Sequence, residues 1–212
     1  MKLENWKEKA FFFGILGCII YVILIFLAMV FYPGGTPTNP NTTGYTFWEN
    51  WLSDLGLIES HSGKNNIVSM ILFTIALTFW GVSLIPLFLA LRTLFTESKL
   101  DKILSTIGSI LGIIAGIGLI GIAYTPADIL GLLHITFVYI AYLSLFILGV
   151  IYSIVLFKSK RLPIQYAITF LIWTILFFLT LSMGIVGQKI GRFSTIVCFA
   201  YVGYGALKLE KS

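Results

Sequence analysis

Apolar residues fill long, nearly uninterrupted blocks of the chain, and polar residues are confined to short segments between them. Six blocks approach or exceed the ~20 residues that a helix needs to cross a ~30 Å hydrocarbon core. They span residues 10–32, 66–95, 103–124, 126–157, 163–186 and 190–207, the last being the shortest. Period-two alternation typical of a transmembrane barrel is absent, and a lipid-exposed segment must satisfy its own backbone hydrogen bonds. The pattern predicts an all-α, polytopic membrane helix bundle with six transmembrane helices in a single domain.

The composition agrees with this prediction. Hydrophobic residues make up 58% of the chain and charged residues 11%, against about 25% charged residues in an ordinary soluble domain. No water-soluble fold could bury so much apolar surface. The first block follows Lys7 and Lys9 as the apolar region of a signal peptide would, but it exceeds the usual length of about 7 to 15 residues and no A-x-A-like site follows. We therefore expect an uncleaved anchor.

Basic residues are distributed unevenly between the two predicted sides of the membrane. With a cytoplasmic N-terminus, the segments on the outer side carry only Lys64, Lys189 and Arg192, and all the other Lys and Arg residues lie on the inner side. The positive-inside rule then places both termini of this multi-pass protein in the cytoplasm, at the cell membrane. A basic inner rim facing anionic lipid explains the net charge of +5 without a nucleic-acid partner. Asn41-Thr42-Thr43 fits the glycosylation acceptor pattern on the outer side.

The only long connection, residues 33–65, contains a segment with helical periodicity. Thr46 and Glu49 have the spacing of a capping box, and Gly56 is a plausible C-terminal stop. The apolar residues recur on one face and the polar residues on the other: Phe47, Trp48, Trp51, Leu52 and Leu55 against Glu49, Asn50, Ser53 and Asp54. This pattern predicts a short amphipathic helix over residues 46–56 that lies on the outer surface of the membrane.

Small residues mark one face of the third block. Gly108, Gly112 and Gly116 are four residues apart, which favours close helix packing over a pore-lining or ligand-binding role. The same face is a predicted contact in a homo-oligomer. Cys18 and Cys198 lie in the first and last blocks at depths that differ by about 9 Å, which is beyond the reach of a disulfide, so we expect free thiols.

Few ionisable residues can reach the inside of the bundle, and all belong to its outer half. His134 lies about 13 Å down the fourth helix from Thr125. A histidine at this depth is a functional candidate, unless it is neutral and bonded to a neighbouring Ser, Thr or Tyr. Asp54 and Asp128 are the acids expected near it, with Ser53 as a further catalytic candidate. Asp128 has an alternative role as a helix cap with Thr125, and Asp54 could instead be solvated on the loop helix.

A predicted ligand-binding set lies on the same side of the membrane. Gln188, Lys189 and Arg192 precede the final span, and Arg192 could pair with an acid or present its planar fork to a phosphate. Asn50 and Glu49 of the loop complete the set.

Motifs that would identify a metal site, a cofactor or an enzyme class are absent. No H-E-x-x-H or C-x-x-C spacing is present, and His61 is expected to be solvated, so no metal ligands are predicted. A G-x-S-x-G elbow and a phosphate-binding glycine loop are absent too, and no cofactor is predicted. The catalytic residues, and whether the protein is an enzyme, stay open at this point.

The motifs above resemble those of a prokaryotic membrane family, domain of unknown function 998. Its first-loop motif of aromatic residues, Asn and Ser-Asp-Leu-Gly is similar to the segment from Tyr45 to Gly56, and its Tyr-Pro-Gly-Gly is similar to residues 32–35. Pro126, Asp128 and His134, and the pair Gln188 and Arg192, are similar too. More distantly, Ser53-Asp54 and the six-span plan resemble the eukaryotic Frag, DRAM and Sfk group, whose members are tied to lipid remodelling or membrane trafficking. The resemblance implies lipid handling without supplying a mechanism.

Three functional hypotheses follow. The leading one is an accessory protein that binds or helps to remodel membrane lipid, with Arg192 and Lys189 at an anionic headgroup and Asp54, Asp128 and His134 orienting it. The second is an intramembrane hydrolase with His134 as general base beside an aspartate. Intramembrane lipid amidases that combine Ser and Asp with several metal-binding histidines are a poor match, because this chain has two histidines. The third is an ion- or proton-coupled transporter.

Overall fold

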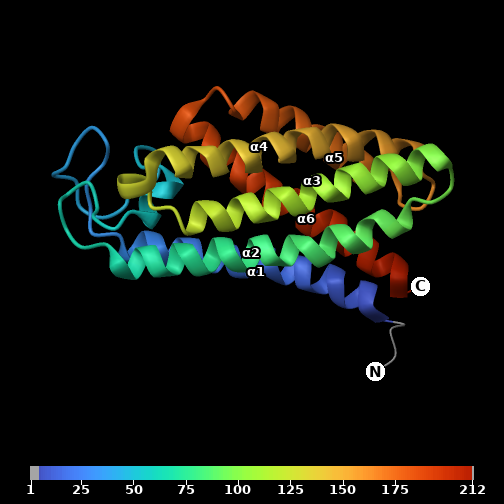
Figure 1. Cartoon of the computed structure of the whole chain (residues 1–212), viewed down its shortest axis with the longest axis horizontal. Coiled ribbons are helices and arrows are strands. Elements are labelled where there is room, and N and C mark those ends of the chain that lie inside the picture. The colour runs from blue at the N-terminus through green and yellow to red at the C-terminus, as the bar shows by residue number, and fades with distance from the viewer. Residues whose placement is uncertain (1–4, 212) are drawn as a thin grey trace.

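The computed structural model describes residues 5–211, which form an all-helical bundle without a β-strand (Figure 1). The fold class predicted above is confirmed. The helices are α1 Trp6–Phe31, η2 Leu52–Gly56, α2 Ile67–Leu91, η3 Arg92–Leu94, α3 Lys99–Ala123, α4 Ala127–Lys158, α5 Ile164–Thr180 and α6 Gly184–Lys211, where η denotes a short 3₁₀ helix.

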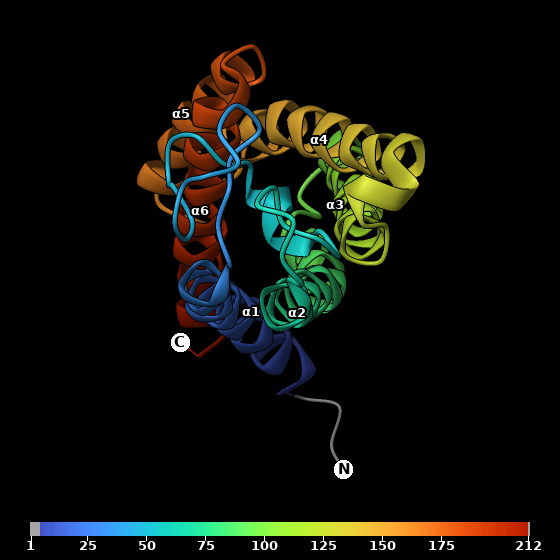
Figure 2. The same ribbon diagram turned by 90° about the vertical axis from the view of Figure 1, so that its left-hand side faces the viewer.

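The six long helices form a closed ring in chain order. Each packs against the next, and α6 returns to pack against α1. Figure 2 shows this ring end-on, with η2 over its middle. The start of α1 and the end of α6 lie at one end of the bundle, and the long loop between α1 and α2 lies at the other (Figure 1). We call these the terminal end and the loop end.

Five of the six helices are long and apolar enough to cross a membrane: α1, α2 with η3, α3, α4 and α6. The outward faces of the helices are apolar, as lipid contact requires. α5 has 17 residues, or about 26 Å at 1.5 Å per residue. The chain is therefore a multi-pass membrane protein in which α5 is the short helix.

The boundary between the last two helices differs from the prediction. α5 ends at Thr180 and α6 begins at Gly184, so the sixth helix is longer than predicted and the fifth is shorter. Two glycines permit this tight turn. Gly184 adopts φ +55°, and a Cβ on Gly187 would lie 2.0 Å from the carbonyl oxygen of Thr180. As a result, residues 188–192 lie inside α6 rather than before it.

Aromatic rings fill the middle of the ring of helices toward the terminal end. The ring of Phe199 lies 5.4 Å from that of Phe88, 6.1 Å from Phe170 and 5.1 Å from Trp173. Tyr152 completes the cluster, 5.9 Å from Phe88. These buried side chains come from α2, α4, α5 and α6, so they hold opposite sides of the ring together.

The glycine face of α3 packs within the chain. A Cβ added to Gly108 would contact Tyr152, one added to Gly112 would contact Phe88, and one added to Gly116 would contact the backbone of Gly81. This face therefore joins α3 to α2 and α4, and it is not free to carry the predicted homo-oligomer contact. The oligomer stays a prediction. Both cysteines are free, as expected.

Ion pairs of the terminal end neutralise part of its basic charge. Three connect neighbouring segments there: Lys7 with Glu210 at 3.2 Å, Lys158 with Asp101 at 3.3 Å, and Arg161 with Glu97 at 3.5 Å. Each pair has at least one half-buried or exposed member, so the pairs add little to the stability of the fold.

Candidate functional site

The segment predicted to be an amphipathic helix, residues 46–56, is not one continuous helix. Its backbone makes a turn and then extends at Trp51, with φ −70° and ψ 153°, before entering η2. Glu49 and Trp48 are exposed, Trp48 by 58%, whereas the amide and the carboxylate assigned to the polar face are buried. The prediction was wrong because these polar groups serve the backbone of the loop rather than water.

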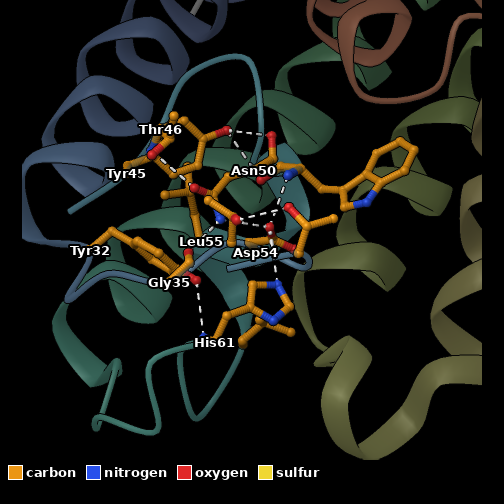
Figure 3. Close-up of polar contacts among 12 residues, drawn as sticks. Tyr32, Gly35, Tyr45, Thr46, Asn50, Asp54, Leu55 and His61 are labelled. Atoms are coloured by element: carbon orange, nitrogen blue, oxygen red, sulfur yellow. Dashed lines mark hydrogen bonds and ion pairs between the residues drawn. The ribbon is translucent and has the colours of Figure 1, made fainter. Parts of the chain in front are cut away.

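Asn50 and Asp54 form the centre of a buried polar network (Figure 3). The amide nitrogen of Asn50 donates to the Gly35 carbonyl at 2.9 Å and to Oδ2 of Asp54 at 3.0 Å, and its oxygen accepts from the Thr46 backbone at 2.9 Å. The backbone N–H of Trp51 donates to the same Oδ2 at 2.9 Å. Asn50 therefore takes the place in the turn that the predicted capping box gave to Glu49, and the network satisfies backbone groups that the irregular loop would otherwise leave unpaired.

The histidine that faces Asp54 is His61, which we expected to be solvated. Its Nε2 lies 3.3 Å from Oδ2 of Asp54 (Figure 3). Gly35, at φ +84°, lets the backbone at residues 61–62 pass close to its own backbone, since a Cβ on Gly35 would lie 2.3 Å from the backbone nitrogen of Ser62. The backbone N–H of His61 donates to the hydroxyl of Tyr32 at 3.3 Å. The loop is thus folded around an imidazole and a carboxylate.

Tyr45 closes the network toward the membrane. Its hydroxyl donates to the backbone carbonyl of Trp51 at 3.1 Å. Burial, and next the negative charge of Asp54, raise the pKa of Tyr45 above its usual range. The hydroxyl therefore stays protonated and available as a donor.

α6 holds the loop by two neighbouring side chains. Oε1 of Gln188 accepts a hydrogen bond from the Leu52 backbone at 2.6 Å, and Nζ of Lys189 donates to the carbonyl oxygen of Asn50. Two of the predicted ligand-binding residues therefore have protein partners that fasten the loop to the bundle. We call the fastened segment, residues 35–61, the lid.

Asp128 holds the lid from the opposite side. Its Oδ2 accepts from the backbone N–H groups of Ile58 at 2.9 Å and Glu59 at 3.1 Å. The predicted capping role is wrong, because Pro126 occupies the N-cap of α4 and makes no side-chain cap. The carboxylate instead reaches across to another segment.

His134 is buried, but it is paired with neither aspartate. Its Nδ1 lies 2.7 Å from the backbone carbonyl of Thr125, and the carboxylates of Asp54 and Asp128 have the partners given above. The oriented acid and base that the hydrolase hypothesis requires at His134 are absent from residues 5–211. That hypothesis would now depend on His61.

Ser53 of the predicted catalytic set and Glu49 of the predicted ligand-binding set are the remaining positions. Ser53 is half-buried and Glu49 is exposed. Within the described chain, no group of three or more His, Cys, Asp and Glu side chains is placed to hold a metal ion.

Arg192 lies in the interior of the bundle, and little around it neutralises the positive charge of its guanidinium. It is 6% exposed, and its guanidinium carbon lies 5.3 Å from the ring centre of Trp80 and 5.4 Å from that of Tyr142. Within the described part of the chain, its side chain donates one hydrogen bond, from Nη2 to the Tyr142 hydroxyl at 3.4 Å. No carboxylate of residues 5–211 forms an ion pair with it. Tyr21 is buried beside this group, with its ring 4.7 Å from Trp80.

Lys189 is a second buried cation, one helical turn from Arg192. It is 1% exposed, and its Nζ lies 5.7 Å from the ring centre of Tyr45 and 5.4 Å from that of Phe47. Like Arg192, it has no ion pair with a carboxylate among the described residues. The structure therefore brings together Asn50, Asp54 and Lys189 from the predicted set, and Arg192 lies one turn further along α6 against Trp80 and Tyr142.

Four contributors to the site were missed in the sequence: Tyr21, Trp80, Tyr142 and His61. The three aromatic residues lie in apolar spans, where their spacing does not distinguish them from packing residues. His61 could have been predicted, because the sequence has only two histidines and each is therefore a candidate partner for a buried acid.

Two apolar hollows of about 290 and 410 Å³ lie at the loop end of the bundle. The first is lined by residues of α2 together with Ala123, Tyr124 and Pro126, and the second by residues 129–136 of α4. Arg192 lines neither hollow, so a ligand reaches it only if the lid or nearby side chains move.

Comparison of the chain with known proteins finds no matching family model, no matching curated protein and no matching solved structure.

Proposed function

We propose that this protein binds the anionic headgroup of a membrane lipid at Arg192, beneath the lid. The observation that carries the proposal is a guanidinium that is 6% exposed and has no carboxylate partner in the described chain. Burying a charge in a low-dielectric interior is costly unless it is paired. An ionisable residue retained inside a membrane bundle usually serves a ligand or an ion.

The chemistry around Arg192 favours an anion over a cation. The polar atoms that converge there belong to the guanidinium and to the hydroxyl of Tyr142, which can both donate hydrogen bonds, and Tyr21 is buried beside Trp80 of the same group. Carboxylates are missing from the group. Arginine also presents two parallel N–H groups that match the paired oxygens of a phosphate or carboxylate.

The depth of the site favours a lipid as the source of this anion. Arg192 lies eight residues from the start of α6 at Gly184, which is about 12 Å along the helix. The helices around it face lipid on their outer sides. A lipid-handling role is also what the resemblance in the outer-loop motif implies.

We further propose that the terminal end faces the cytoplasm of the cell and that the lid lies on the outer side. Of the three basic residues at the loop end, Lys189 and Arg192 are buried and Lys64 is exposed. The excess of exposed basic residues at the terminal end over the loop end is therefore larger than the sequence count alone indicates. The positive-inside rule assigns the end with this excess to the cytoplasm.

The lipid proposal is tested by native mass spectrometry of protein reconstituted with phosphatidylglycerol. We expect a bound lipid on the wild type, and a loss on the order of tenfold in bound fraction for Arg192→Gln, since the charge-assisted contact disappears. Arg161→Gln is the matched control, because Arg161 is exposed and its partner is Glu97. This control should bind like the wild type.

A second variant protects the test against misfolding of Arg192→Gln. Tyr142→Phe keeps the ring and removes only the hydroxyl that contacts Arg192. It should weaken lipid binding, and a retained cooperative thermal transition would show that the variant is folded. Equal lipid binding by the wild type, Arg192→Gln and Tyr142→Phe would refute the proposal.

A further inference from the structure

The charges buried at the loop end do not balance. Asp54 is 4% exposed, Lys189 is 1% exposed and Arg192 is 6% exposed. Asp54 and Lys189 are joined through Asn50, whose amide donates to Asp54 and whose backbone carbonyl accepts from Lys189. With the histidines counted as neutral, one negative and two positive charges leave a single net positive charge inside this part of the bundle.

The other charged groups at the loop end are exposed to solvent and do not cancel this charge. They are Glu49, Glu59, Lys64 and Asp128. Water and salt screen charges in such positions far more effectively than charges in the interior. The nearest acid that is buried, Asp54, is already joined to Lys189 through Asn50 and accepts hydrogen bonds from the loop.

From this balance we infer that the site selects a headgroup carrying one negative charge and no positive charge, on a phosphodiester or a carboxylate. The inference rests on the proposed function, and it names the chemical class of the ligand. A single anion neutralises the site. A phosphomonoester carries nearly two negative charges at neutral pH and would leave an uncompensated one in the interior.

A zwitterionic headgroup fits the site less well for the opposite reason. Its positive group would add to a net positive charge, and the buried carboxylate that could pair with it, Asp54, already accepts hydrogen bonds from Asn50 and Trp51. A phosphodiester and a carboxylate each present two equivalent oxygens, which a guanidinium can bind together. The guanidinium geometry therefore fits any phosphodiester or carboxylate, and the net charge of the headgroup selects among them.

The experiment measures competition between lipids on intact protein at pH 7.5. Protein is reconstituted with equal amounts of phosphatidylglycerol, phosphatidic acid and phosphatidylcholine, and the bound species are counted by native mass spectrometry. The inference predicts that phosphatidylglycerol exceeds each competitor on the order of tenfold, because one uncompensated charge in the interior costs at least this much. A fatty acid should compete with phosphatidylglycerol, and dimethyl phosphate in solution distinguishes a free anion from a lipid as the source.

Two substitutions shift the balance in opposite directions. Asp54→Asn keeps an oxygen for the hydrogen bonds from Asn50 and Trp51 but raises the net charge to two. It should move the preference toward phosphatidic acid. Lys189→Met brings the net charge to zero and should reduce the advantage of phosphatidylglycerol over phosphatidylcholine.

The outcomes separate this inference from the proposed function. Binding of all three lipids at the wild-type site without charge preference, or the same preference in both substituted proteins, would overturn the inference and leave lipid binding at Arg192 intact. Failure of every lipid to bind would overturn both. A response to dimethyl phosphate equal to that of phosphatidylglycerol would keep the monoanion selectivity and identify a soluble ligand.

Discussion

Single buried amides organise the lid. Besides Asn50, Asn66 is 1% exposed, and its Nδ2 donates to the backbone carbonyls of Leu57 at 2.8 Å, Leu55 at 3.2 Å and Asp54 at 3.4 Å. One side chain thus serves three carbonyls of the irregular segment around η2. The shape of the lid depends on such groups, because an irregular backbone has no ladder of its own to satisfy them.

Asn66→Ala should therefore destabilise the protein by about 1 to 3 kcal/mol, the usual cost of leaving buried polar groups without a partner. We expect the thermal transition in detergent to fall by several degrees, with faster amide exchange in residues 52–57. Asn41→Ala, at an exposed position of the same loop, provides the control. A transition for Asn66→Ala that matches this control would show that the three contacts do not stabilise the lid.

At this scale the sequence indicated a polar cluster at the outer mouth but paired its members wrongly. Asp54, Lys189 and Arg192 were named because ionisable residues are scarce near the spans. Their partners could not be predicted, since a lone carboxylate gives no sign of whether His61 or His134 will reach it. That depends on how the loop folds back.

Glycine contacts determine how closely the helices approach. A Cβ on Gly116 of α3 would lie 2.6 Å from the carbonyl oxygen of Gly81 of α2, so the two backbones are in direct contact. Close approach of this kind replaces the hydrophobic driving force that is missing between helices in lipid. It also holds α2, which carries Trp80, in place beneath the lid.

Gly116→Ala should separate α2 from α3 and cost about 1 to 3 kcal/mol, as overpacking typically does. The control is Gly131→Ala on α4, where an added Cβ meets nothing within 4 Å. Thermal denaturation in detergent should show a lower transition temperature for Gly116→Ala and no decrease for Gly131→Ala. Similar transitions for the two variants would contradict the packing account.

Helix positions were predicted well and two elements poorly. Apolar length reports a span directly, so the bounds of the first four helices agree to within a few residues. The turn between α5 and α6 was predicted several residues too late, because apolar residues continue through it and only Gly184 and Gly187 mark the reversal. Residues 46–56 have helical spacing, but burial of Asn50 and Asp54 replaces the helix with a turn and η2.

The whole molecule is a ring of six helices that is filled differently at its two ends. Aromatic side chains around Phe199 occupy the middle toward the terminal end, whereas Arg192 and Lys189 lie inside toward the loop end. Gln188, Lys189 and Asp128 hold the lid over that second half. A basic interior beneath a fastened lid is the arrangement from which we propose an anion site.

The most direct test of the central claim is a crystal structure of the protein with phosphatidylglycerol in a lipidic phase. The account predicts a phosphate whose oxygens lie about 2.7 to 3.0 Å from the guanidinium nitrogens of Arg192, at charge-assisted hydrogen-bond distance. The Tyr142 hydroxyl should contact the same group. A structure in which Arg192 forms an ion pair with a carboxylate of the chain, while the lipid phosphate lies elsewhere, would contradict the account.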